Sequence, residues 1–177
     1  MGLRLLMLLL VAAAAGTVAG IAPNAPAAAA PSTVAIARPS SAEPMRSCPI
    51  PAKFRIAFET AAADAGIPLA MLVAVATVES NLRSDVSSEA GAHGLLQVLP
   101  STAAELDLDT YHVDENVLAG ARYLRMMLDR FRSTDMALAA YNAGPTAVEA
   151  RGARPNDETV AYVANVTTEW RRLLGCV

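Results

Sequence analysis

The strongest constraint on the fold is an almost unbroken apolar run from residue 67 to residue 78, which ends at Glu79. Pro68 suits the first turn of a helix, so the run predicts a helix over roughly Pro68 to Ser80. Because this helix is apolar on every side, it needs neighbours on every side. The sequence therefore predicts a central helix that is surrounded by other helices.

The rest of the chain after residue 47 also carries helical patterns. Apolar or small residues recur at helical spacing from Lys53 to Asp64, just before Gly66, a natural C-terminal cap. Other helices are expected from about Pro100, from Asp114 to Phe131, from Met136 to Asn142 and from Asp157 to Leu174. The predicted inner face of the last helix consists of Val160, Val163, Val166, Trp170 and either Leu173 or Leu174. No segment alternates as a substantial sheet would, so the predicted fold class is all-α, with at most a small hairpin within residues 81–94.

The first 47 residues are expected to lie outside the domain. Residues 1–20 contain one Arg, a short Leu-rich run and then small residues, which is the layout of an export signal cleaved near Gly20. Residues 21–47 are mainly Ala, Pro and Ser, which indicates a flexible linker. The apolar block of the signal is shorter than the ~20 residues of a membrane span. We therefore expect one domain, residues 48–177, exported to the periplasm or beyond the cell, without a stable membrane span.

The chain has only two cysteines, Cys48 at the start of the predicted domain and Cys176 next to its end. In an exported chain this placement predicts a disulfide, although two buried, unpaired thiols would fit the same positions. The two cysteines and the two histidines, His93 and His112, lack the spacing of a metal site. No metal and no cofactor are therefore expected.

The charge of the domain limits its partners. Of 14 basic and 17 acidic side chains, three basic and one acidic precede residue 48, which leaves the domain a formal net charge of −5. A negative domain is poorly suited to nucleic acid or anionic lipid as its main ligand. We expect a monomer that binds neither.

Glu79 is the first candidate for chemistry. At the C-terminal end of a buried helix, desolvation and the negative end of the helix dipole both favour the protonated carboxyl. A carboxyl that is protonated near neutral pH can protonate a leaving oxygen as a general acid. A helix that frays at Glu79 and leaves its side chain solvated would fit the same residues, so the helix alone leaves both interpretations open.

Several further motifs occur in one order along the domain. They are Glu79-Ser80, GAHGLLQVLPSTA from Gly91, AGARYL from Ala119, ALAAYNAGP from Ala137 and ETVAYVANV from Glu158. Together they resemble the catalytic domain of the soluble lytic transglycosylase family, a lysozyme-like fold that cuts bacterial cell-wall glycan. The resemblance covers nearly the whole chain from about Cys48 onward, and it implies peptidoglycan glycan strands as the substrate.

The resemblance assigns roles to individual residues. It places the family's catalytic acid on Glu79 and the hydroxyl of its Glu-Ser pair on Ser80. The family's Gly-Leu-Met-Gln motif appears with Leu96 in place of Met, which puts a side-chain contact to sugar in doubt. Gln97 keeps an amide that can both donate to and accept from sugar hydroxyls or an N-acetyl group.

The resemblance also implies that Tyr141 and Tyr162 lie in the cleft near the acid, where a phenol can bond the carboxyl and stack on a sugar. Asn142 and Glu158 are expected to contact substrate as well. Other interpretations remain open: Asn142 as a helix-end cap, Tyr162 as a core aromatic, and Glu158 as a first-turn carboxylate that favours its helix N-terminus.

The reaction follows from the number of catalytic carboxylates. Hydrolysing glycosidases commonly use two, whereas the family pattern supplies only Glu79. The resemblance implies that Glu79 protonates the oxygen between N-acetylmuramic acid and N-acetylglucosamine, and then takes a proton from the muramoyl C6 hydroxyl to close a 1,6-anhydro ring.

Two alternatives remain open on the sequence. One is a lysozyme-type hydrolase in which Asp85 or Glu89 orients a water. The other is a non-catalytic module that binds peptidoglycan or docks on an envelope-spanning secretion machine. The sequence does not decide between cleavage at chain ends and cleavage at internal bonds.

Overall fold

The computed structural model describes residues 46–150 and 156–177. The expected export signal, residues 1–20, and nearly all of the expected linker lie outside these residues. Within the two described ranges, no helix is both long enough and apolar enough to cross a membrane.

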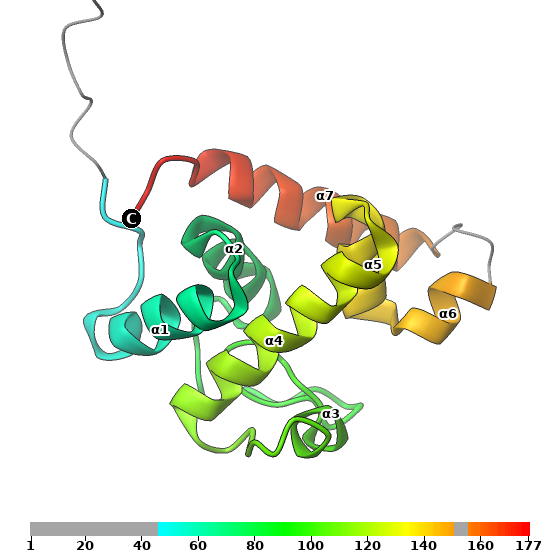
Figure 1. The fold of residues 1–177 in the computed structure, drawn as a ribbon, viewed down its shortest axis with the longest axis horizontal. Coiled ribbons are helices and arrows are strands. Elements are labelled where there is room, and N and C mark those ends of the chain that lie inside the picture. The colour runs from blue at the N-terminus through cyan, green and yellow to red at the C-terminus, as the bar shows by residue number, and fades with distance from the viewer. Residues whose placement is uncertain (1–45, 151–155) are drawn as a thin grey trace, which may run out of the picture. The chain divides into compact units, whose positions relative to one another are not determined.

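The described residues form seven α-helices and one short 3-10 helix (Figure 1). They are η1 Ala52–Phe54, α1 Arg55–Ala65, α2 Leu69–Ser80, α3 Pro100–Ala104, α4 Val113–Phe131, α5 Thr134–Ala143, α6 Pro145–Ala150 and α7 Asp157–Arg172. In the same residues there is no β-strand, which confirms the all-α prediction. The irregular segment after α2 has only isolated antiparallel bridges at His93, to Ser87 and to Val98, in place of a hairpin.

Helix α2 lies at the centre of the domain, as its composition predicts. All residues from Ala70 to Ala76 are buried, and such a run covers every face of the helix. Helices α1 and α7 pack against it, while α4 packs on α1 and α5 (Figure 1). The helix continues through Ser80, so Glu79 lies in its last turn and the alternative of a frayed end at Glu79 is wrong.

The helix boundaries agree with the sequence at α1 and differ after α5. Gly66 ends α1 with a left-handed backbone, φ 60°, and its N–H bonds to Ala62 O and Ala63 O. Gly144-Pro145 ends α5, as expected, but Pro145 also begins α6, a helix that the sequence analysis did not predict. Proline suits this first helical position because the N–H that it lacks would have no partner there.

The inner face of α7 agrees with the predicted one except at Val160. Val166 and Leu173 are buried, and Val163 and Trp170 pack against the core. Val160 is 52% exposed, whereas Thr159 and Tyr162 are buried. Spacings of three and four residues place the buried set on one side of the helix. Near the N-terminus of α7 this side packs against the polar side chains of Asn142 and Glu79. Thr159 and Tyr162 hydrogen-bond to them, and Val160 lies on the exposed side.

A disulfide joins Cys48 to Cys176, which are 128 residues apart in the sequence. Two backbone hydrogen bonds flank it, from Cys48 N to Val177 O at 3.1 Å and from Val177 N to Arg46 O at 3.0 Å. The first described segment and the end of the chain are therefore held together covalently and by hydrogen bonds.

Candidate active site

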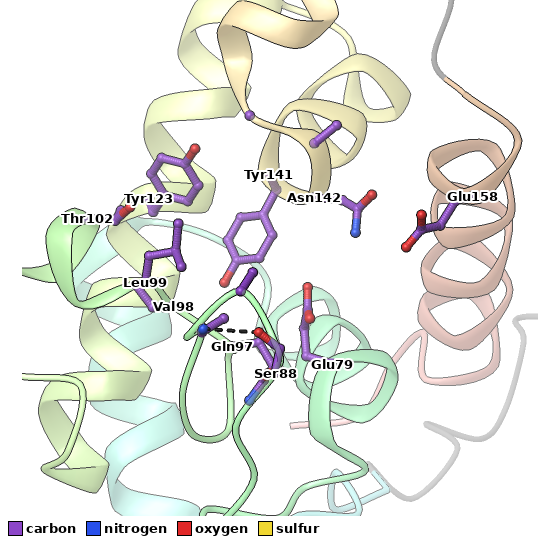
Figure 2. Close-up of a pocket in the computed structure, with 14 residues that line it drawn as sticks. Glu79, Ser88, Gln97, Val98, Leu99, Thr102, Tyr123, Tyr141, Asn142 and Glu158 are labelled. Atoms are coloured by element: carbon purple, nitrogen blue, oxygen red, sulfur yellow. Dashed lines mark hydrogen bonds between the residues drawn. The ribbon is translucent and has the colours of Figure 1, made fainter.

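A cleft of about 410 Å³ opens at the C-terminal end of α2 (Figure 2). Of the residues that the sequence analysis singled out, the cleft is lined by Glu79, Gln97, Tyr141, Asn142 and Glu158. They come from α2, the irregular segment, α5 and the first turn of α7. Figure 2 shows Glu79 rising toward Tyr141 and Asn142, with Glu158 facing them from α7.

Glu79 is partly buried, and among the described residues one group donates a hydrogen bond to its carboxyl. The Tyr162 hydroxyl donates to Glu79 Oε1 at 2.7 Å. Burial raises the pKa of Glu79 to about 7, and the hydrogen bond from Tyr162 opposes part of that rise. Near neutral pH the carboxyl is thus divided between its protonated and ionised forms, as its place in the sequence predicts.

We expect the Tyr162→Phe variant to raise the pKa of Glu79 further. The phenol stabilises the carboxylate, so its loss favours the protonated acid while the burial of Glu79 persists. Carbon-13 NMR titration of the Glu79 carboxyl measures this directly. Tyr111→Phe is the matched control, because Tyr111 is exposed and its ring stacks on His93. An unchanged or lowered pKa in the Tyr162→Phe protein would contradict the expectation.

The Tyr141 hydroxyl bonds a backbone carbonyl and not the Glu79 carboxyl. Tyr141 is buried, and its O–H donates to Leu96 O at 2.8 Å. Its ring lies 5.3 Å from that of Tyr123, which also lines the cleft. The phenol that bonds the carboxyl is therefore Tyr162. It is a buried aromatic that does not line the cleft, which corrects the expectation that it contacts substrate.

Ser80 does not line the cleft, which corrects the expectation that it contacts substrate. It is buried, and its hydroxyl donates to Ala76 O at 3.0 Å and Leu95 O at 2.9 Å. A short hydroxyl beside a buried helix end is well placed to bond carbonyls. Ser80 ties the irregular segment to the end of α2, next to Glu79.

The turn at residues 94–97 brings Gln97 to the cleft, and α4 holds this turn in place. Asn116 is 1% exposed; its Oδ1 accepts from Leu96 N at 3.0 Å, and its Nδ2 donates to His93 O and Thr110 O. A Cβ at Gly120 would lie 2.4 Å from the Leu96 side chain, so only glycine allows this approach. Leu96 itself is fully buried, so the position where the family has Met belongs to the core here.

Two of these residues were missed by sequence reasoning. Asn116 falls within the helix expected from Asp114 to Phe131 and was given no role of its own; the signal for that role is a polar residue directly before the apolar face of α4. Tyr123 lies inside the AGARYL segment, where an aromatic among small residues was the available signal.

Gln97 lines the cleft, but the nitrogen of its side-chain amide is already hydrogen-bonded within the protein. Its Nε2 donates to Val86 O at 3.1 Å and Gly94 O at 2.9 Å. These internal bonds correct the expectation that the amide both donates to and accepts from a sugar. The group that remains for a ligand is the acceptor, Oε1.

Asn142 and Glu158 lie at facing helix ends. Asn142 is exposed in the last turn of α5, and its Oδ1 accepts from the Thr159 hydroxyl at 3.1 Å. Glu158 is exposed in the first turn of α7, so it has both a helix-terminal position and a place in the cleft. Both residues also line an adjoining recess of about 220 Å³.

The other carboxylates considered for catalysis lie away from the cleft. Asp85 and Glu89 are exposed, Asp85 pairs with Arg83 at 3.7 Å, and neither lines the cleft. Among the described residues, Glu158 is the one carboxylate besides Glu79 that does. The same residues include no group of three or more His, Cys, Asp or Glu placed to hold a metal ion.

A helical domain whose central helix ends in a part-buried, protonatable carboxyl at a cleft is compatible with a lysozyme-like fold. The model of the Transglycosylase SLT domain family matches residues 56–162 of this sequence. The chain belongs to this family.

Individual relatives are similar over parts of their length. The transglycosylase of Enterobacteria phage PRD1 is 36% identical over 75 residues, which are 42% of this chain and 28% of the phage protein. The membrane-bound lytic murein transglycosylase F of Cellvibrio japonicus is 32% identical over 96 residues, which are 50% of this chain and 19% of that protein.

Two solved structures of lytic transglycosylases match this chain in fold as well as in sequence. An inactive glutamate-to-glutamine mutant of lytic transglycosylase Slt from Pseudomonas aeruginosa matches with a TM-score of 0.61 and 28% identity, over 72% of this chain and 25% of that one. The 70 kDa soluble lytic transglycosylase of Escherichia coli matches with a TM-score of 0.58 and 27% identity, over 70% and 25%. This chain spans less than a third of the length of each of these four relatives.

Proposed function

We propose that this protein is a peptidoglycan lytic transglycosylase. It cleaves the β-1,4 bond between N-acetylmuramic acid and N-acetylglucosamine and leaves 1,6-anhydro-muramoyl ends. The observation that carries the proposal is Glu79, a part-buried carboxyl that lines the cleft and has a pKa of about 7. Such a carboxyl can give up a proton and take one back in the same pH range.

The relatives support this assignment. The curated and solved relatives are named transglycosylases, and the Pseudomonas aeruginosa structure is of a mutant inactivated by replacing one glutamate with glutamine. The cause that raises the pKa of Glu79 is burial, and no neighbouring carboxylate contributes to the rise. This arrangement differs from a closely coupled carboxylate pair, in which one group raises the pKa of the other.

The reaction has two steps at one carboxyl. Protonated Glu79 first donates its proton to the glycosidic oxygen as the bond breaks, and the cationic sugar centre is stabilised by the substrate's own N-acetyl group. Ionised Glu79 then accepts the proton of the muramoyl C6 hydroxyl as that oxygen closes the anhydro ring. No water is consumed. The hydroxyl is tethered to the reacting sugar, so its effective concentration can exceed that of loosely held water.

One observation favours a second candidate, a hydrolase of the same bond. Glu158 lines the cleft with Glu79, and hydrolysing glycosidases commonly use two carboxylates. In that case Glu158 is the residue that would orient water, because Asp85 and Glu89 lie outside the cleft. A purely binding module has less support, since binding alone does not require a buried acid.

The masses of the released fragments separate the two reactions. We expect fragments from purified peptidoglycan to be lighter by one water than the products of a hydrolytic lysozyme, with no terminus that borohydride reduces. Reducible muramic acid as the main terminus would contradict the transglycosylase assignment. Loss of those products in Glu158→Gln would then establish the hydrolase.

The organisation of the whole chain supports action in the cell envelope. We infer an export signal at residues 1–20, a linker at 21–47 and a catalytic domain at 48–177 that acts as a monomer on glycan strands in the periplasm or outside the cell. Docking on an envelope-spanning secretion or assembly machine is compatible with such a tethered domain. Mass spectrometry of the N-terminus of protein recovered from the exported fraction tests cleavage near Gly20.

A further inference from the structure

Two amide side chains, those of Gln97 and Asn142, line the cleft. In each of them one of the two polar atoms is already hydrogen-bonded within the protein. The Nε2 group of Gln97 lies between the carbonyls of Val86 and Gly94. The reverse orientation would place an amide oxygen against two carbonyl oxygens, so this polarity is secure. Gln97 therefore presents its oxygen, an acceptor, to the cleft.

Asn142 is held in the opposite sense by Thr159. The Thr159 hydroxyl donates to Asn142 Oδ1 at 3.1 Å, and Thr159 is only 2% exposed. Among the described residues, this hydroxyl has no other hydrogen-bond partner. With the Asn142 amide turned over, Nδ2 could donate to the Thr159 oxygen, but the hydroxyl proton would lose the one acceptor that the described residues give it, which costs free energy. Asn142 therefore presents Nδ2, a donor.

Thr159 is itself fixed in place. Its backbone N–H donates to Oδ1 of Asn156, the N-cap of α7, at 2.8 Å. The helix start thus sets the position of the Thr159 side chain, which lies beneath the exposed end of Asn142.

We propose that Thr159 is a positioning residue that sets the polarity of the Asn142 amide, so that the cleft offers a donor at Asn142 and an acceptor at Gln97. The ligand group that suits Asn142 is an uncharged acceptor oxygen of the glycan, such as an acetamido carbonyl. This inference rests on the proposed function for the identity of the ligand, and it adds a residue that touches Asn142 rather than the sugar.

The test uses the binding of soluble, peptide-free glycan strands to the full chain carrying Glu79→Gln, which separates binding from cleavage. In this background we expect Asn142→Ala to weaken binding about fivefold and Thr159→Val about threefold, as loss of a net hydrogen bond implies. Thr159→Ser keeps the hydroxyl and is expected to bind within about twofold of the reference protein.

The double variant distinguishes positioning from general damage. If Thr159 acts only through Asn142, the combination of Thr159→Val and Asn142→Ala binds about fivefold more weakly, as Asn142→Ala does alone, and not about fifteenfold. Thr167→Val is the matched control, because it changes a threonine on the same helix whose buried Oγ1 has no hydrogen-bond partner among the described residues. We expect Thr167→Val to leave binding unchanged.

Three results would overturn the inference. Unchanged binding in Thr159→Val, or an additive loss in the double variant, would refute the positioning role while leaving the proposed function intact. No glycan binding by the reference protein would refute the proposed function, and this inference would fail with it.

Discussion

Replacing Glu79 with Gln is expected to lower the rate of glycan cleavage by about a thousandfold or more, because one carboxyl serves as acid and then as base. The amide keeps the shape of the side chain and an oxygen that can accept from Tyr162, which donates at 2.7 Å. It lacks the proton that the leaving oxygen requires. Release of soluble fragments from purified peptidoglycan measures the loss.

The same substitution is expected to stabilise the fold at alkaline pH. The pKa of Glu79 rises from its ordinary 4.5 to about 7 on folding, so between these values the folded protein binds more protons than the unfolded one. The free energy of unfolding of the wild type therefore falls as pH rises through this window. The amide of the Glu79→Gln variant does not titrate, so the advantage of the variant should be absent near pH 4 and reach at most about 3 kcal/mol near pH 8.

Urea unfolding at several pH values tests the stability difference, and Glu89→Gln is the matched control for cleavage. Glu89 is exposed and outside the cleft, so its replacement should leave cleavage unchanged. A folded Glu79→Gln protein that keeps most of its activity would refute the catalytic assignment. Equal stability of Glu79→Gln and the wild type near pH 8 would refute the raised pKa.

Removing the disulfide is expected to have the largest effect on stability. In the chain-entropy model, a loop closed over 128 residues contributes about 5 kcal/mol to the free energy of unfolding. That is a large part of the stability of an ordinary domain. The Cys48→Ala, Cys176→Ala double variant should therefore unfold at much lower urea concentration than the oxidised wild type.

A reducing agent provides the internal control, because the chain has no other cysteines. Reduction should lower the stability of the wild type toward that of the double variant and leave the double variant unchanged. The folded double variant should still cleave glycan, since Glu158 lies in the first turn of α7 and the disulfide follows the other end of this 16-residue helix, which is about 24 Å long. A stability loss below about 1 kcal/mol would show that the flanking backbone bonds hold the ends together alone.

Much of the fold could be predicted because its causes are local in the sequence. The run before Glu79 is apolar on all faces, which requires a central helix whatever the neighbours are. Gly66 marks the end of α1 through its left-handed backbone, a cause that acts within a few residues. Asp114 and Glu115 mark the start of α4 as first-turn carboxylates, which favour a helix N-terminus, and no side chain caps this helix. The helix after Gly144 was missed because Gly-Pro signals both the end of one helix and the start of another.

The sequence by itself determined that the domain is helical and that α2 is central, because a helix that is apolar on every face needs packed neighbours. It left open whether the helix reaches Glu79 and keeps its carboxyl from water, so the raised pKa of Glu79 was decided by the tertiary structure. Only the tertiary structure decided which polar atoms face the cleft. Tyr162 reaches Glu79 across 83 residues, Tyr141 bonds Leu96 across 45, and Ser80 bonds Leu95 across 15. Each hydrogen bond depends on the distance and angle between two atoms, and those are set by packing between elements far apart in the sequence.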